Sequence, residues 1–197
     1  MFFDILKRLD RILFVLIHND SDHKILDGVM LITRDPVTWI PLFIFMVFYI
    51  IKYKKAKALS FLSIALATVA INYTVTTVWL QPLFGRLSPC RDPQLQKFLR
   101  GIIACSNRYS FPSSYSASLF GLVIFWICSF QFFKTRKWIL FLIWVFFLCY
   151  AQIYVGRNFP FDIIAGAILG SIIGLLMSKI YKHLPVSRQK HFPKKYS

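Results

Sequence analysis

The fold is decided by a long apolar stretch near the C-terminus, which reads IIAGAILGSIIGLLMSKIY over Ile163–Tyr181. A helix needs about 20 apolar residues to cross the hydrocarbon core of a bilayer, and this stretch has nearly that length. Its glycines Gly166, Gly170 and Gly174 recur at every fourth position, a spacing that lets helices approach closely inside a membrane. The stretch therefore predicts a membrane-spanning helix packed against a neighbour in the same chain, although the spacing also fits the dimer face of a homo-oligomer.

Four further apolar stretches lie upstream, at Val37–Ile51, Ala58–Leu80, Ser118–Phe133 and Trp138–Val155. The 197 residues are 57% hydrophobic and 18% aromatic, whereas soluble domains average about 45–50% apolar residues. Such long apolar blocks exclude a disordered chain and argue against a soluble globular domain. We therefore predict an all-α integral membrane protein with five transmembrane helices, which form one domain over residues 1–184.

The N-terminal segment Phe2–Ile17 has a different pattern from these spans. Its apolar residues recur at helical spacing with charged residues between them, which is typical of an amphipathic helix. The segment lacks the uninterrupted apolar centre and the small-residue cleavage site of a signal peptide. We expect it to lie on the membrane surface, or to form a sixth membrane helix that packs obliquely.

The net charge is +16, from 24 Lys and Arg against 8 acidic residues, all of which are Asp. The basic residues lie between apolar runs and not on a polar domain, so the charge does not indicate a nucleic-acid partner. They gather after the first, third and fifth predicted spans, and loops rich in Lys and Arg face the cytoplasm. The pattern predicts that segments 82–117 and 156–161 face outward and that the basic tail 185–197 is cytoplasmic.

The outward segment Gln81–Ala117 is too long for a simple connection, so we expect the chemistry there. It holds Cys90 and Cys105, fifteen positions apart, in a compartment that permits a disulfide. A short helix is expected at Gln94–Ile103. Asp162 opens the fifth span directly, and an acid at that depth needs a cationic partner. Three arginines lie on the same side of the membrane to supply one: Arg86, Arg91 and Arg157.

The polar residues of these outward segments resemble, in order and spacing, the motifs of type 2 phosphatidic acid phosphatases, membrane enzymes that remove phosphate from lipids. The first family motif, Lys-x6-Arg-Pro, corresponds to Gln81-x6-Ser88-Pro89. The second, Pro-Ser-Gly-His, corresponds to Pro112-Ser113-Ser114-Tyr115. The third, Ser-Arg-x5-His-x3-Asp, corresponds to Ala151-Gln152-x5-Asn158-x3-Asp162. The resemblance extends from about Leu9 to Leu176 and implies the helical membrane fold of that family.

The resemblance also implies what each position does in the family. The His of the third motif attacks phosphorus, the Asp orients that His, and the His of the second motif protonates the leaving oxygen. The Lys and the two Arg bind the phosphate oxygens. In this chain Asn158 holds the nucleophile position, and its amide nitrogen cannot form a phosphoenzyme. Tyr115 holds the acid position, and neutral side chains replace all three cations: Gln81, Ser88 and Gln152.

These substitutions predict a catalytically inactive family member that binds a phosphorylated or anionic lipid headgroup at the outer membrane face. We expect the residues at the family positions to form a largely neutral polar network around a pocket: Gln81, Ser88, Ser113, Tyr115, Gln152, Asn158 and Asp162. The candidate phosphate-binding residues are Arg86, Arg91 and Arg157, since a guanidinium can donate two parallel hydrogen bonds to phosphate. No cofactor and no metal is expected, because the four histidines lie in terminal segments without metal-ligand spacing.

Three alternatives stay open. The first alternative is an active phosphatase with an altered site, in which Tyr115 or Ser113 supplies a hydroxyl and Asp162 is the base. The second is a scaffold without a ligand, whose polar residues satisfy one another. The third is a channel or transporter. The family resemblance implies a phosphorylated lipid, such as a polyprenyl diphosphate, phosphatidylglycerol phosphate or a lipid A, and a bacterial inner membrane with the site facing the periplasm.

Overall fold

A computed structural model of the chain describes residues 2–19, 24–54, 57–105, 108–130, 136 and 138–184. The predicted tail 185–197 and most of the basic loop 131–137 lie outside the described residues. Within the described ranges the chain is helical, and its only β-type pairing is an isolated bridge between Leu87 and Tyr109. The all-α fold predicted from the apolar blocks is confirmed.

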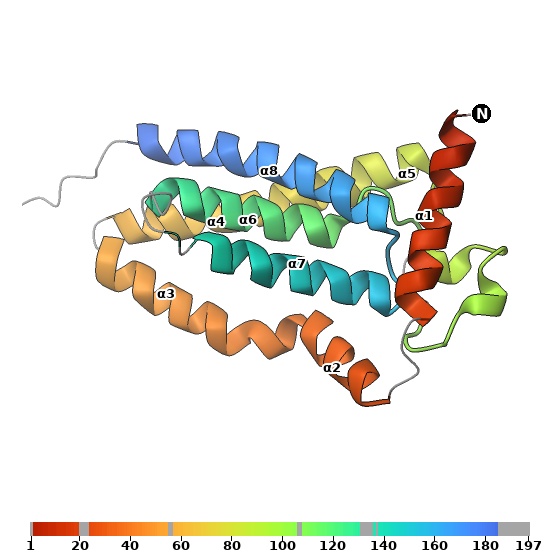
Figure 1. Cartoon of the computed structure of the whole chain (residues 1–197). Coiled ribbons are helices and arrows are strands. Elements are labelled where there is room, and N and C mark those ends of the chain that lie inside the picture. Colours follow the sequence, from red (N-terminus) through yellow and green to blue (C-terminus); the bar gives the residue numbers. More distant parts are fainter. Residues whose placement is uncertain are drawn as a thin grey trace, which may run out of the picture.

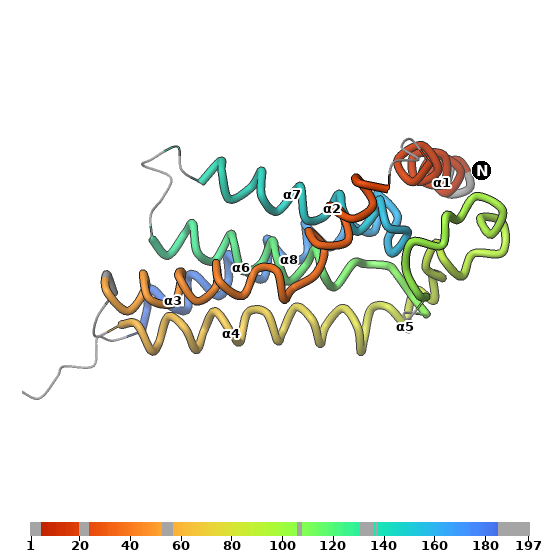
Figure 2. Tube along the Cα trace, turned by 90° about the horizontal axis from the view of Figure 1, so that it is seen from below, coloured from red at the N-terminus to blue at the C-terminus, as the bar shows by residue number. Residues whose placement is uncertain are grey.

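Apolar helices run side by side and form an elongated bundle (Figures 1 and 2). They are α3 (Ile40–Lys54), α4 (Ala58–Thr74), α6 (Ser114–Phe130), α7 (Trp138–Tyr154) and α8 (Pro160–His183). Helix α4 continues through a π-helical turn, Val75–Leu80, into α5 (Gln81–Phe84). The helical stretch Ala58–Phe84 and helix α8 are each long and apolar enough to cross a membrane.

The remaining apolar helices divide into two kinds. Helices α6 and α7 have 17 residues each, which at 1.5 Å per residue is slightly short of a bilayer core about 30 Å thick. Helix α2 (Lys24–Arg34) and the helix that follows from Pro36 pass the length and hydropathy test together, but a bend of 67° separates them. The chain is thus an integral membrane protein, and the count of five spans stays a prediction.

Helices α6 and α8 form the most extensive helix contact of the bundle, and the glycines of α8 make it possible. A Cβ added at Gly170 or Gly174 would overlap a backbone carbonyl oxygen of α6, and one added at Gly166 would overlap the carbonyl of Ser113 just before α6. Because no side chain fits into this contact, the two backbones touch directly. The glycine face therefore serves packing within the chain, as the first of the two sequence interpretations predicts.

Helix α1 (Phe2–Asn19) runs across one end of the bundle instead of along it (Figures 1 and 2). Asp10, Phe14 and His18, four positions apart, are buried on the face that meets the bundle. The opposite face is an exposed apolar stripe, formed by Ile5, Leu9, Ile12, Leu13 and Leu16. This arrangement agrees with an amphipathic helix on the membrane surface. Helix α2 follows it and was not predicted from the sequence.

The connection from α5 to α6 departs from its predicted structure. A helix was predicted at Gln94–Ile103, whereas the structure has only a short 3-10 turn at Gln96–Phe98. Side chains on either side of that turn are held by other elements, since Asp92 binds Arg11 of α1 and Arg100 binds Asp27 of α2. These tethers keep the segment irregular, so the predicted helix is wrong.

The two cysteines of this connection lie next to each other. The Cα atoms of Cys90 and Cys105 are 5.8 Å apart and their sulfur atoms lie at bonding distance. The disulfide itself stays a prediction, which a mobility difference between reducing and non-reducing gels tests. Cys128 and Cys149 are buried thiols within α6 and α7.

Candidate functional site

A cavity of about 330 Å³ lies where the helices end, on the side of the bundle that carries α1. Helices α2, α4 to α7 and the turn before α8 all contribute to its wall. Four of the seven family positions line it: Gln81, Tyr115, Gln152 and Asn158. The three sequence motifs, far apart along the chain, therefore meet at one cavity.

Two of these side chains also fix the backbone that leads into α6. The Gln81 amide donates a hydrogen bond to the Pro112 carbonyl oxygen at 3.0 Å. The Asn158 amide donates to the Ser110 carbonyl oxygen at 3.1 Å. Part of the neutral polar lining thus holds the second motif in place.

Gln152 is different, because its side-chain oxygen is buried without a hydrogen-bond partner among the described residues. The residue is only 3% exposed and lines the cavity. Leaving a buried carbonyl oxygen unpaired costs about 1–3 kcal/mol. The oxygen itself is closed off from the cavity in this structure, so a ligand hydroxyl or a bound water can supply the missing donor only if the amide turns.

The other three family positions are buried beside the cavity and do not line it. The Ser113 hydroxyl accepts a hydrogen bond from the Ser116 amide at 3.3 Å, and Ser88 lies against Cys90. Asp162 accepts a hydrogen bond from the Phe159 amide at 2.8 Å. Asp162 is therefore committed to the start of its own helix, and no hydrogen bond joins it to Asn158 among the contacts of the described residues.

Arg86 is the cationic partner that the depth of Asp162 predicts. Its guanidinium donates to Asp162 at 2.8 Å and to Asp10 of α1 at 2.5 Å. The same group lies over the ring of Phe159, 4.1 Å from the ring centre. Both carboxylates are fully buried. The ion pair of Asp10 with Arg86 was not predicted from the sequence. The signal was present, because Asp10 lies four residues before Phe14, the spacing at which residues share one face of a helix.

The three predicted phosphate-binding arginines do not gather at one place. Arg86 is held by the two carboxylates, and the exposed Arg91 makes a long 3.4 Å hydrogen bond to the Cys105 carbonyl oxygen. Only Arg157 lines the cavity, where it is joined by Arg34 from the last turn of α2. Arg34 was not predicted as a site residue, because helix α2, which carries it, was not predicted. The signal in the sequence is a basic residue two positions before Pro36, at the entrance to a predicted span.

Two basic side chains give the lining of this cavity positive charge. No carboxylate and no histidine is among its described lining residues, whereas two arginines are. Burial and, to a lesser degree, the nearby charge of Arg34 lower the pKa of Arg157, so an anion between the two guanidiniums is favoured. Within the described ranges no group of three His, Cys, Asp or Glu side chains is placed to hold a metal. The described lining of the cavity therefore offers two guanidinium groups to an anion.

Comparison with known proteins identifies relatives of known activity. The lipid A 4'-phosphatase of Bacteroides thetaiotaomicron is 30% identical over 162 residues, which cover 80% of this chain and 70% of the relative. The lipid A 4'-phosphatase of Porphyromonas gingivalis is 27% identical over 177 residues, covering 88% and 73%.

Two solved structures share the fold. A PAP2-type phosphatidylglycerolphosphate phosphatase from Bacillus subtilis has a TM-score of 0.67 at 18% identity, over 93% of this chain and 90% of that chain. LpxE from Aquifex aeolicus has a TM-score of 0.61 at 22% identity, over 87% and 95%. Residues 57–184 match the PAP2 superfamily as a whole. The chain therefore belongs to the PAP2 superfamily and has the fold of its membrane lipid phosphatases.

Proposed function

We propose that this chain binds the phosphorylated headgroup of a membrane lipid in the cavity of the family site and does not cleave it. The observation that carries the proposal is the pair Arg34 and Arg157, which face a cavity without a carboxylate among its described lining residues. A guanidinium donates two parallel hydrogen bonds to phosphate, so two of them suit a phosphate group. Affinity for phosphate is thus kept by residues outside the family motifs.

The side chains at the reactive positions support binding without hydrolysis. Asn158 cannot act as a phosphorus nucleophile, and the phenol of Tyr115 needs a base within hydrogen-bond reach. Asp162 is the candidate base, but it is engaged by the Phe159 amide and Arg86 and does not line the cavity. The Ser113 hydroxyl is likewise buried and does not line the cavity.

The relatives suggest which lipid to test first. Two of them are lipid A 4'-phosphatases, so a phosphorylated sugar lipid of the lipid A type is the first candidate ligand. The buried oxygen of Gln152 adds a second criterion, because it requires a hydrogen-bond donor. A hydroxyl of a sugar or glycerol headgroup next to the phosphate meets that requirement.

An active phosphatase with an altered site is the second candidate function, and the 30% identity to a lipid A 4'-phosphatase favours it. In that case Tyr115 supplies the hydroxyl and Asp162 the base. Phosphate release would then be inhibited by vanadate, lost in Asp162→Ala and retained in Asn158→Ala.

Phosphate release by the purified protein in detergent separates the two functions. The substrates are a lipid A, phosphatidylglycerol phosphate, phosphatidic acid and a polyprenyl diphosphate. Three proteins run in parallel: the native chain, Asp162→Ala, and a restored variant carrying Q81K, S88R, Y115H, Q152R and N158H. Binding without hydrolysis predicts release by the restored variant alone. Release by the native chain above the Asp162→Ala level shows an active enzyme and overturns the proposal.

A binding experiment tests the two arginines directly. Affinity for the lipid is measured by native mass spectrometry for the native chain, R34Q/R157Q and the charge-matched control K179Q/K182Q, whose lysines are exposed on α8. Hydrogen bonds to charged groups contribute about 1.5–3 kcal/mol each, so R34Q/R157Q should weaken binding about tenfold or more. Equal affinity in all three proteins would support a scaffold without a ligand in this cavity.

A further inference from the structure

A second cationic region lies on the other side of the turn between α7 and α8. Arg157 and Asn158 of this turn line the family cavity, whereas Phe159 lines a separate cavity of about 350 Å³ between α1 and the α5–α6 connection. A further cavity of about 480 Å³ shares Lys7, Arg11 and Gln94 with it. Together they form a groove along α1, which we call the α1 groove.

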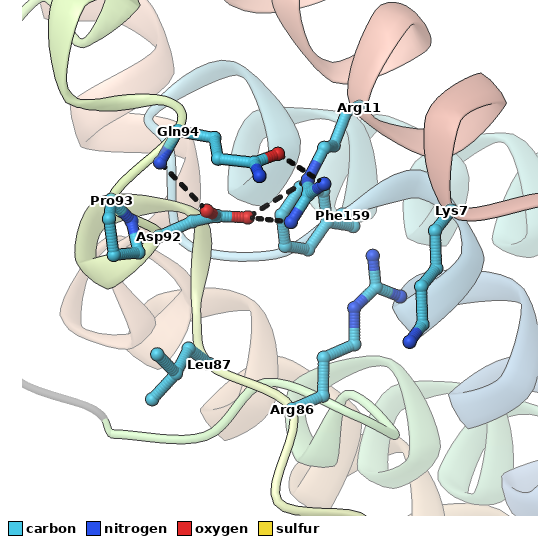
Figure 3. Close-up of a pocket in the computed structure, with 8 residues that line it drawn as sticks. All are labelled: Lys7, Arg11, Arg86, Leu87, Asp92, Pro93, Gln94 and Phe159. Atoms are coloured by element: carbon cyan, nitrogen blue, oxygen red, sulfur yellow. Dashed lines mark hydrogen bonds and ion pairs between the residues drawn. The ribbon is translucent and has the colours of Figure 1, made fainter. Parts of the chain in front are cut away.

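The α1 groove is lined by four cations, Lys7, Arg8, Arg11 and Arg86, and by one acid, Asp92. Figure 3 shows the amino group of Lys7 and the guanidinium of Arg86 directed into the same space. Behind Arg86 lie two further carboxylates, which both bind that guanidinium. Positively charged side chains that line the open side of one groove favour the binding of an anion between them.

Two of the four cations have no partner among the side chains that the structure describes. Arg11 binds Asp92 at 2.8 Å and Gln94 at 2.6 Å, and Arg86 is held by its carboxylates. Lys7 and Arg8 are exposed, and neither makes a hydrogen bond or ion pair with a side chain that the structure describes. These two side chains can turn toward a ligand without breaking a contact to another described side chain.

The position of the groove indicates that the anion belongs to a lipid. Ile12 lines the groove and is part of the exposed apolar stripe of α1, 56% exposed itself. Figure 1 shows α1 across one end of the helical bundle. The end of a membrane-spanning bundle is where a bilayer surface is expected, so we infer that the stripe contacts that surface. Basic side chains beside an interfacial apolar helix face attract anionic headgroups, while the apolar face contacts the acyl region.

We propose that the α1 groove binds the phosphate group of an anionic membrane lipid, at a site separate from the family cavity. The walls are formed before binding, since Asp10 anchors α1 to Arg86 and Arg11 anchors it to Asp92. A preformed site avoids the free-energy cost of ordering α1 at the moment of binding. The proposal does not depend on the ligand of the family cavity.

The test uses the full chain with R34Q/R157Q as its background, so that binding to the family cavity does not contribute. Native mass spectrometry in detergent measures the affinity for phosphatidylglycerol, with phosphatidylcholine as the zwitterionic lipid. Adding K7Q/R8Q should weaken phosphatidylglycerol binding about tenfold or more, because each basic side chain near a membrane surface contributes measurably to anionic-lipid affinity. Adding K179Q/K182Q should change it less than about twofold.

Other outcomes would overturn the proposal. An equal loss in K7Q/R8Q and K179Q/K182Q indicates general charge attraction, and no loss in K7Q/R8Q indicates that the groove is not a binding site. If phosphatidylcholine binds as tightly as phosphatidylglycerol, the negative charge of the lipid does not contribute to binding. Displacement of the lipid by an equal concentration of inorganic phosphate shows that the occupant is free phosphate. Lys7, Arg8, Lys179 and Lys182 are exposed, whereas Arg34 and Arg157 are half-buried. Unchanged thermal unfolding relative to the R34Q/R157Q background confirms that each variant is folded.

Discussion

At the scale of single residues, one guanidinium group forms ion pairs with two buried carboxylates. Arg86 joins Asp10 of α1 to Asp162 of α8, and both acids are fully buried. In the family the acid at the position of Asp162 orients the nucleophilic His, but here the neighbouring position holds Asn158. In the structure the Asp162 carboxylate fastens the start of α8 and, through Arg86, the N-terminal helix.

The exchange Arg86→Gln should destabilise the protein by about 3–5 kcal/mol, because it leaves two buried carboxylates without their cation. Arg91→Gln is the matched control in the same connection, since Arg91 is exposed and makes only a long hydrogen bond. Its cost should stay below about 1 kcal/mol. Thermal unfolding in detergent compares the two variants. Equal unfolding temperatures would show that the ion pairs do not contribute to stability.

His18 has both ring nitrogens engaged in the structure. Its Nδ1 lies 2.6 Å from the Tyr154 carbonyl oxygen and therefore donates, while Nε2 accepts from the Arg100 amide at 3.0 Å. These two bonds require a neutral ring with its proton on Nδ1. Burial is the main cause that lowers the pKa of His18 below its usual value.

A neutral buried histidine makes stability depend on pH. Because the folded pKa is below the unfolded value of about 6.5, the unfolded chain binds the proton more readily, and stability present above that pH is lost as the pH falls. The unfolding temperature should therefore decrease between about pH 7.5 and about pH 5. His18→Gln keeps a donor and an acceptor but does not titrate, so its unfolding temperature should vary less over this range. An identical pH profile would contradict the role of His18.

At the scale of elements, direct backbone contact between α6 and α8 brings the second and third motifs together. Ser113, just before α6, donates its amide to the Asp162 carbonyl oxygen at 3.0 Å. The Ser116 hydroxyl donates to the Ile163 carbonyl oxygen at 2.8 Å. Glycines continue the contact along α8, so the site depends on residues that never touch it.

Gly170→Ala should destabilise the protein by about 1–3 kcal/mol, because its added methyl group overlaps the Ala117 carbonyl of α6. Gly28→Ala is the control, since an added Cβ at Gly28 in α2 has no neighbour within 4 Å. Alanine favours a helix over glycine by about 1 kcal/mol, so that variant should be as stable as the native chain or more so. Unfolding in detergent measures both, and a neutral Gly170→Ala would contradict the close contact.

The errors in the predicted elements share one physical cause. Long apolar runs gave α3, α4, α6, α7 and α8 their positions, because burial in a bilayer acts on each run independently. Helix α2 and the segment Gln94–Ile103 are polar enough to depend on distant partners. Arg100 binds Asp27, 73 positions away, and no local pattern reveals a contact of that kind.

At the scale of the whole molecule, every part of the candidate site lies at one end of the bundle. Helices α1 and α2, the α5–α6 connection and the turn before α8 meet there (Figures 1 and 2). The charge pattern predicts that this end faces outward, and α1 lies on the same side as segment 82–117 because Arg11 binds Asp92. The five basic residues before the first span therefore accompany the outward loops.

Single cysteines test this topology. Gln94→Cys and Arg8→Cys, both at exposed positions of the site end, should react with a membrane-impermeant thiol reagent in intact spheroplasts. Arg136→Cys, exposed between α6 and α7, should react only after the membrane is permeabilised. Reaction of Arg136→Cys alone in intact spheroplasts would mean that the site faces the cytoplasm. Opposite behaviour of Gln94→Cys and Arg8→Cys would mean that α1 does not lie on the side of the connection.

The sequence by itself determined the membrane class, the helical fold and the family, because apolar run length and motif spacing are local properties. The tertiary structure decided which side chains share a cavity. It separated Arg86 from Arg157, although both lie in segments predicted to face outward, and it brought Arg34 to the family site. It also placed Asp10 beside Asp162, 152 positions later in the chain. Such contacts depend on how helices cross and on where buried charges find partners, and sequence spacing alone does not contain that information.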